Sequence, residues 1–208
     1  DDNVLTVGET TTQLARFADA ETVDVNLVFQ SNSGLSAADN ITLSNYITAL
    51  TAARKDAVGF VSPERAATAN AAAPATTVAT WRTGLTSTSY GFADSSALYV
   101  YDKYQDVYRW ISAAGSMAGL TANADLVQDA WFSPAGFTRG NVRNVTKLAW
   151  NPSQSERDEL YKTGVNPIVT FPGQGTVLFG DKTLQAKPSA FDRINVRRLF
   201  IVLEKAVS

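Results

Sequence analysis

The chain has 208 residues, of which 45% are hydrophobic and 18% are charged, and its formal net charge is −2. This length suits one domain with a substantial core, and we expect residues 1–208 to form a single domain. The small net charge disfavours nucleic-acid binding as the main task, because it creates no field that would attract a phosphate backbone. The charged fraction lies below the roughly 25% of typical soluble domains, which indicates a surface that is partly covered by a partner.

The sequence contains no histidine and no cysteine. A Ser-His-Asp triad needs an imidazole, and a thiolate nucleophile or a typical zinc site needs sulfur or imidazole. We therefore expect no enzyme activity, no cofactor and no metal, and no group that could activate a serine as a base at neutral pH. No apolar run reaches the about 20 residues that cross a bilayer, so no membrane insertion is expected.

The first 61 residues predict a strand, a helix and a second strand. A short helix is expected over residues 10–19, and alternating apolar side chains predict a strand over residues 23–29. Apolar residues at helical spacing predict a helix over residues 36–55, and a short buried strand follows over residues 57–61. This order is typical of a βαβ unit and implies a parallel sheet with a right-handed crossover.

The rest of the chain continues to alternate short strands and helices. The fold class is therefore α/β, with a layered, largely parallel sheet, helices on both faces and one β-hairpin. The expected segments are a loop over 64–76, a helix over 77–84, a hairpin over 98–101 and 107–111, a helix over 112–120, a strand over 130–132, an extended segment over 144–150, a helix over 153–162, and strands over 167–171 and 176–179.

The predicted hairpin is rich in aromatic side chains, namely Tyr99, Tyr101, Tyr104, Tyr108 and Trp110. Such rings can form a stacking platform for a sugar or a single-stranded nucleic acid. The alternative is that the rings of the hairpin pack into the core, and this is the arrangement that we expect.

A competing functional hypothesis places a ligand at the parallel sheet. Open α/β sheets bind ligands beyond the carboxyl ends of their strands, which here lie near residues 30–34 and 62–65. An enzyme or nucleotide-binding domain would use this position.

Several blocks near the C-terminus follow one another in a recognisable order. Gly-Val-Asn-Pro-Ile at residues 164–168 precedes Gly-Gln-Gly at 173–175, Gly-Asp-Lys-Thr-Leu at 180–184 and Asn-Val-Arg-Arg-Leu at 195–199. Together with Ala-Trp-Phe-Ser-Pro-Ala-Gly at 130–136, they resemble the contractile-tail sheath proteins of bacteriophages. Asp-Lys-Tyr-Gln-Asp-Val-Tyr-Arg-Trp at residues 102–110 and Ser-Ala-Phe-Asp-Arg-Ile-Asn-Val-Arg-Arg-Leu-Phe at 189–200 resemble the version in T-even-like phages.

The resemblance implies an α/β core of subtilisin-like topology without protease chemistry. It implies a structural subunit of the helical sheath that surrounds the tail tube and shortens to drive this tube through the host envelope. Implied partners are other copies of the subunit, the inner tail tube, and baseplate and tail terminator proteins. The implied location is the virion, after synthesis in the host bacterial cytoplasm.

Two further expectations come from the same resemblance. A sheath subunit of a bacterial contractile injection system shares every local feature and stays open as an alternative. The strand-donating arms and the C-terminal domain of the family are not found in residues 1–208, so we expect this chain to be the core of a longer subunit.

The last predicted helix, over residues 195–208, has one strongly apolar side. The residues expected to be buried are Val196, Leu199, Phe200, Leu203 and Val207. On the opposite side, Ile201 lies between Arg197 and Lys205. Our hypothesis is that Arg197, Ile201 and Lys205 contact another subunit or the C-terminal domain, with the acid-rich stretch 1–24 as a candidate partner surface.

Overall fold

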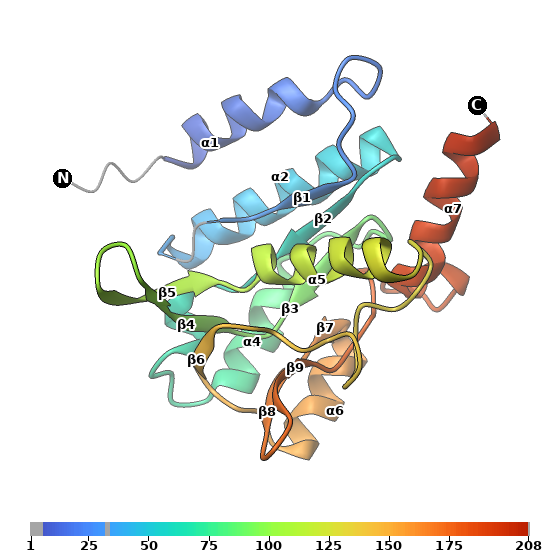
Figure 1. The fold of residues 1–208 in the computed structure, drawn as a ribbon. Coiled ribbons are helices and arrows are strands. Elements are labelled where there is room, and N and C mark those ends of the chain that lie inside the picture. The colour runs from blue at the N-terminus through green and yellow to red at the C-terminus, as the bar shows by residue number, and fades with distance from the viewer. Residues whose placement is uncertain (1–5, 32–33, 208) are drawn as a thin grey trace.

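The computed structural model describes residues 6–31 and 34–207. Its centre is a four-stranded parallel sheet in the order β1-β2-β3-β7. The strands are β1 (Leu27–Phe29), β2 (Val58–Val61), β3 (Gly91–Asp94) and β7 (Val165–Asn166). Every residue of β2 and β3 is buried, because helices and loops cover both faces of the sheet. Figure 1 shows this layered arrangement.

One face of the sheet is covered by the helices that connect its strands, together with short α3 (Arg65–Thr68). The covering helices are α2 (Ala37–Arg54), α4 (Pro74–Thr83) and α6 (Gln154–Thr163). Ile47, Trp81 and Leu160 from these three helices belong to one buried cluster with Val61 and Ala93 of the sheet. Helix α1 (Val7–Leu14) and a 3-10 turn (Ala15–Phe17) lie along the outer side of α2.

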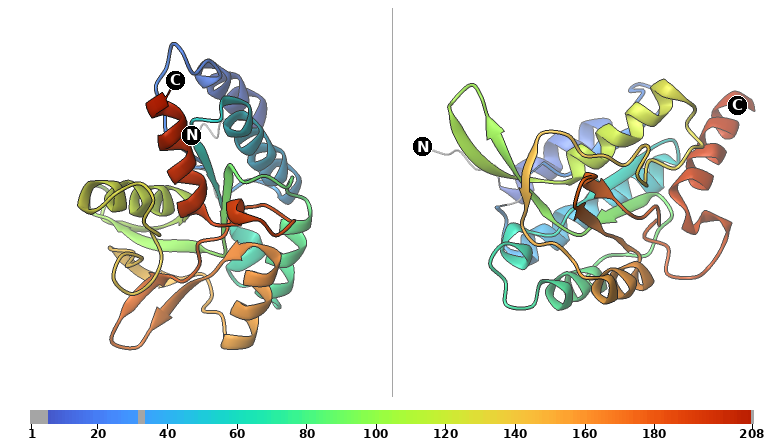
Figure 2. Two further views of the ribbon diagram at one scale, coloured as in Figure 1. Left: turned by 90° about the vertical axis from the view of Figure 1, so that its right-hand side faces the viewer. Right: turned by 60° about the horizontal axis from the view of Figure 1, so that its bottom comes forward.

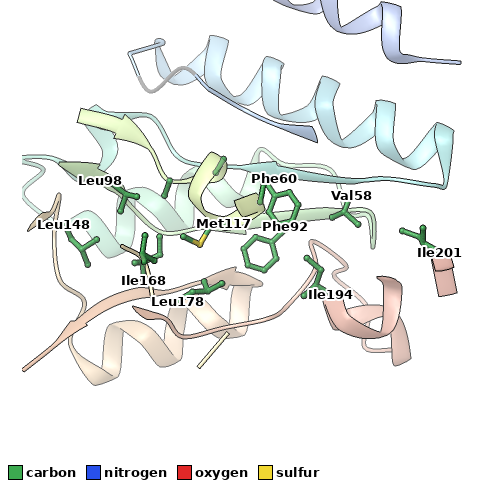
Figure 3. Packing of buried hydrophobic residues seen from close by; sticks show 14 residues of the cluster. Val58, Phe60, Phe92, Leu98, Met117, Leu148, Ile168, Leu178, Ile194 and Ile201 are labelled. Carbon is green, nitrogen blue, oxygen red and sulfur yellow. The ribbon is translucent and has the colours of Figure 1, made fainter. Parts of the chain in front are cut away.

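The opposite face carries α5 (Ala114–Val127) and a second buried cluster. Phe60 of β2 and Phe92 of β3 meet there with ring centroids 5.3 Å apart, and Met117 of α5 packs in the same cluster (Figure 3). Two small antiparallel sheets close this side. They are formed by β4 (Ala97–Asp102), β5 (Val107–Ser112) and β6 (Val145–Leu148), and by β8 (Ile168–Phe171) with β9 (Gly175–Leu178).

Helix α7 (Ile194–Val207) leaves this body at one end. The right-hand view of Figure 2 shows α7 at the edge of the molecule. The buried residues of α7 all lie between Ile194 and Ile201, and each residue after Ile201 that the structure describes is exposed, although Lys205 still contacts Asp24.

Two glycines occupy backbone positions that other residues would not fit. Gly164 ends α6 in the left-handed conformation, with φ = 89°, which glycine adopts without steric cost. Gly140 lies so close to the backbone that a Cβ atom would come within 2.6 Å of the Leu178 carbonyl oxygen. Both positions are set by backbone shape and take no part in chemistry.

The main elements expected from the sequence are confirmed. The βαβ unit is parallel, with Leu27 opposite Val58, and α2 begins at a Ser36 side chain that accepts the Asp39 amide. The α/β class and the helices on both faces are also confirmed. The expected strand at residues 130–132 is wrong, since these residues form a turn, and residues 64–76 hold α3 and the start of α4 in place of a continuous loop.

The prediction that the hairpin aromatics pack into the core is wrong. Leu98 and Ile111 occupy the inner face of the β5-β4-β6 sheet, so the pleat turns Tyr99, Tyr101 and Tyr108 outward. Tyr101 is 48% exposed and Tyr108 is 52% exposed. The outward rings contact one another: the centroids of Tyr99 and Tyr108 lie 5.4 Å apart and those of Tyr101 and Tyr108 lie 5.1 Å apart.

Arg54 ties the irregular N-terminal segment to the last turn of α2. Its guanidinium donates to the carbonyl oxygens of Phe17, at 2.5 Å, and Val23, at 2.8 Å, and pairs with the Asp56 carboxylate at 2.8 Å. The Arg54 side chain is fully buried. One cation therefore satisfies carbonyl oxygens of a segment that is neither α-helix nor strand.

We predict that Arg54→Met lowers the free energy of unfolding by on the order of 3 kcal/mol, because it leaves Asp56 and these carbonyl oxygens without their donor. Urea denaturation of the chain measures this loss, and amide exchange after Phe17 should quicken. Arg16→Met is the matched control, because Arg16 is exposed; a change within about 0.5 kcal/mol is expected there. Equal losses in both variants would contradict the anchoring role of Arg54.

Candidate functional site

Buried polar side chains gather at the carboxyl ends of the parallel strands, a region we call the carboxyl edge. Gln30 follows β1, Ser62 follows β2, Asp94 ends β3 and Asn166 ends β7. None of the four is more than 1% exposed. The carboxyl edge is the position at which an α/β domain would hold a ligand, so its hydrogen bonds decide between the two functional hypotheses.

Asp94 is the centre of the carboxyl edge. Its Oδ2 accepts from the Ser62 hydroxyl at 2.5 Å, and its Oδ1 accepts from the Ser96 amide at 3.2 Å. Burial raises the pKa of Asp94 to about 7, although both of these hydrogen bonds act in the opposite direction. The Ser62 oxygen in turn accepts the Ala114 amide at the start of α5, at 2.8 Å.

This arrangement corrects the expectation that no group of the chain could act as a base at neutral pH. Asp94 has a pKa in that range and contacts a serine, and only its surroundings in the fold produce the shift. Asp94 and Ser62 are 0% and 1% exposed, so a substrate has no access to the pair. The pair therefore joins β2, β3 and α5 as a structural contact.

The remaining groups of the carboxyl edge also bind the chain itself. The Asn166 side chain donates to the Ala93 and Lys182 carbonyl oxygens and accepts the Lys182 amide at 2.7 Å. Gln30 accepts from the Ser44 hydroxyl at 3.0 Å. These bonds hold crossing segments over the sheet. Gln30 Nε2 has no hydrogen-bond partner among the described residues, but Gln30 is only 1% exposed and thus closed to a ligand from solvent.

The ligand hypothesis is accordingly not favoured. Gln30 and Ser62 are buried under the chain, while residues 32 and 33 of the expected ligand region lie outside the described residues. Within residues 6–31 and 34–207, no three acidic side chains come together as a metal would require. In the same part of the chain, no helix combines the length and apolarity needed to cross a membrane.

The second candidate site is α7, and here the predicted buried side is wrong. The side of α7 that faces the body carries Ile194, Arg197, Arg198 and Ile201, all buried. Ile201 belongs to the cluster of Phe60 and lies at its edge in Figure 3. The strongly apolar side points outward instead.

Arginine chemistry explains why the helix turns this way. The Arg197 guanidinium lies 4.0 Å from the Phe191 ring centroid and 4.3 Å from that of Tyr90, and its Nε donates to the Ser89 hydroxyl at 2.9 Å. Arg198 pairs with the Asp125 carboxylate at 2.5 Å. A buried arginine is stable when stacking and charge-assisted hydrogen bonds replace its contacts with water. The positions of apolar residues in the sequence do not predict such burial.

Lys205 also contacts its own chain. Its ammonium lies 2.8 Å from the Asp24 carboxylate and 2.7 Å from the Asn26 side-chain oxygen. Asp24 of the acid-rich stretch thus pairs with α7 within one molecule, whereas the hypothesis concerned the contact of this stretch with a neighbouring subunit. The structure brings Arg197, Ile201 and Lys205 together on one side of α7, and that side is occupied.

We call the outward side of α7 its outer face and define it by Val196, Leu199, Phe200, Leu203 and Val207. This face was not identified from the sequence as a contact surface, because an apolar stripe is typical of the buried side of a helix. Phe200 is 39% exposed, Leu203 is 49% exposed and Val207 is 88% exposed. Only the tertiary contacts of Arg197 and Arg198 reveal which side is free.

Comparison with known sequences gives one family and consistent relatives. A family described as "Phage tail sheath protein central domain" matches residues 8–184. The tail sheath protein of Vibrio phage KVP40 is 41% identical over 215 aligned residues, covering 94% of this chain and 32% of the relative. The tail sheath protein of Enterobacteria phage T4 is 41% identical, covering 90% of this chain and 30% of the relative. The chain thus spans about a third of the length of these relatives.

Solved structures show the same fold at low sequence identity. A chain of the anti-feeding prophage baseplate superimposes with a TM-score of 0.72 at 17% identity, covering 100% of this chain and 49% of the other. The helical sheath of the anti-feeding prophage in its contracted state gives a TM-score of 0.69 at 17% identity, covering 99% of this chain and 50% of the other. With the family match over residues 8–184, these findings establish that the chain belongs to the phage tail sheath protein family.

Proposed function

We propose that this chain is part of a subunit of a helical contractile tail sheath that surrounds a tail tube and shortens to drive it through the host envelope. The observation that carries the proposal is the 41% identity to a phage tail sheath protein over 94% of the chain. A sheath protein is a structural component, and membership of this family implies a non-enzymatic role. The proposed location is the phage virion.

The proposed partners are other copies of the subunit, the inner tail tube, the baseplate and the tail terminator. Support for other copies of the subunit and for the baseplate as partners comes from solved structures of the same fold, which are described as a helical sheath and as a baseplate. The fold is also similar to the sheath of an extracellular contractile injection system, at a TM-score of 0.65. We favour a phage tail over such a system because the relatives of 41% identity are phage proteins.

The proposal treats residues 1–208 as one core domain of a longer subunit. Support comes from the two buried clusters, which lie on opposite faces of a single sheet and share its strands. The subtilisin-like topology that the sequence resemblance implies is part of the same proposal. The parallel order β1-β2-β3-β7 with helices on both faces is compatible with it.

A core of this kind contributes to contraction as a rigid body. A tube of identical subunits can store free energy in its extended packing and release it on changing to a shorter packing. Each of these two states needs its own contacts between subunits. Buried side chains such as Arg54, Asp94 and Asn166 hold the loops of this domain to its sheet. The domain can therefore keep its shape while its contacts with neighbours change.

Tube formation tests the proposed function directly. The full-length subunit, expressed alone, should form tubes that negative-stain electron microscopy detects, because sheath contacts repeat between identical copies. Absence of tubes, together with binding of a small ligand in a thermal-shift screen against nucleotides, would favour the competing enzyme hypothesis.

A hydrolase assay tests the non-enzymatic role at Ser62 and Asp94, where a serine contacts a carboxyl group of raised pKa. Wild-type chain and Ser62→Ala should both release product from an activated ester at the rate of buffer alone, because Ser62 and Asp94 are buried. Turnover by the wild type that disappears in Ser62→Ala would contradict the proposal.

The pH dependence of stability tests the structural role of Asp94. Its pKa is raised from the usual 3.8 to about 7 in the folded chain, so the folded state holds this proton more tightly than the unfolded state. Stability should fall as pH rises between these values, by at most about 1.4 kcal/mol per pH unit from this group. Asp94→Asn removes the titration.

Melting temperatures of both proteins between pH 5 and 8 provide the measurement. The difference between Asp94→Asn and wild type should shift in favour of the variant as pH rises. A difference that stays constant over this range would show that Asp94 does not carry the raised pKa.

A further inference from the structure

The orientation of α7 is unusual, because it turns its polar side to the body and its apolar side to solvent. The outer face of α7 lies within an arc of about 100° at 3.6 residues per turn. The inner side holds two buried arginines, each with its own partners. Rotation about the helix axis would expose Ile201 and break both sets of contacts, so α7 cannot bury its apolar side against this body.

The spacing of the outer face identifies the kind of partner. Val196, Leu199 and Leu203 follow one another at intervals of three and four residues, and Phe200 and Val207 flank this row. Such spacing is the pattern by which one helix packs against another. Phe200 is already partly covered by Phe191, with ring centroids 5.0 Å apart, Val196 and Leu199 are half-buried, and Leu203 and Val207 are exposed.

The size of the outer face decides between a separate molecule and the same polypeptide. Helix α7 has 14 residues and is therefore about 21 Å long. With a width of roughly 10 Å, its face offers about 200 Å², against about 800 Å² per partner in a stable complex. A second copy would bind weakly through this face alone. A segment of the same polypeptide needs far less area, because its effective concentration reaches the millimolar range.

The relatives contain additional sequence that could provide such a segment. This chain covers only 32% of the Vibrio phage relative and 30% of the Enterobacteria phage relative, so full-length sheath proteins contain much further sequence. We propose that the outer face of α7 is an intramolecular docking surface for an amphipathic helix of the longer sheath subunit, outside residues 1–208. This inference rests on the proposed function in assuming that longer subunit.

Thiol labelling distinguishes the occupants, since residues 1–208 contain no cysteine. Leu203→Cys is prepared in the 208-residue chain and in the full-length subunit, with any other cysteine of the latter changed to serine. The probe is a water-soluble maleimide. We expect rapid labelling in the 208-residue chain and at least about tenfold slower labelling in the unassembled full-length monomer, because the labelling rate follows the undocked fraction.

Tyr104→Cys is the matched control, because Tyr104 is 87% exposed in the turn between β4 and β5. Figure 1 shows this hairpin on the opposite side of the molecule from α7. It should label equally fast in the 208-residue chain and in the full-length monomer. Slow labelling of Leu203→Cys only after tubes form would assign the face to a neighbouring copy and overturn the proposal. Fast labelling in monomer and tube alike would overturn it too.

A stability measurement supports the labelling. Leu203→Asp should lower the melting temperature of the full-length monomer and leave that of the 208-residue chain unchanged, whereas Leu203→Met should leave both unchanged. A Leu203→Asp effect of equal size in both proteins would contradict docking. The monomer measurements do not require tubes, so they remain decisive even if tube formation, and with it the proposed function, fails.

Discussion

The need to cover both faces of a short parallel sheet determines most of this structure. The central strands β2 and β3 have four residues each and no exposed position. Helices α2, α4 and α6 cover one face, while α5 and two small antiparallel sheets cover the other. Because the strands are short, much of the chain that covers them is irregular, and its backbone polar groups need partners other than a ladder.

Buried polar side chains supply these partners. Arg54 holds the segment after α1, Arg82 donates to the Leu85 and Leu184 carbonyl oxygens, and Asn166 bridges Ala93 and Lys182. The carboxyl edge binds ligands in many α/β domains. In this chain its polar side chains instead form hydrogen bonds with other parts of the same chain. This use of a familiar position agrees with a structural protein and illustrates that fold class alone does not assign function.

Helix α7 shows how the same physics produces a contact surface. Its arginines find aromatic and acidic partners in the body, so the body takes the polar side of the helix and leaves the apolar side outward. An isolated exposed leucine has little meaning, but a stripe at helical spacing is costly to leave in water. In the longer subunit proposed above, this stripe is the surface to which we assign the docking of further polypeptide.

The sequence by itself determined the α/β class, the βαβ unit with helix α2, the hairpin, α6 and the family, because periodicity, capping residues and motif order are local or linear features. It did not reveal β3, whose Gly-Phe-Ala-Asp sequence has no apolar run, or β7, which has only two residues. Only the tertiary structure decided the outward side of Tyr99 and Tyr108, the neutral-range pKa of Asp94 and the orientation of α7. The orientation of α7 depends on contacts between residues far apart in the chain, such as Arg197 with Tyr90, and the raised pKa of Asp94 depends on its complete burial by the fold. Burial and pairing of this kind outweigh local hydrophobicity.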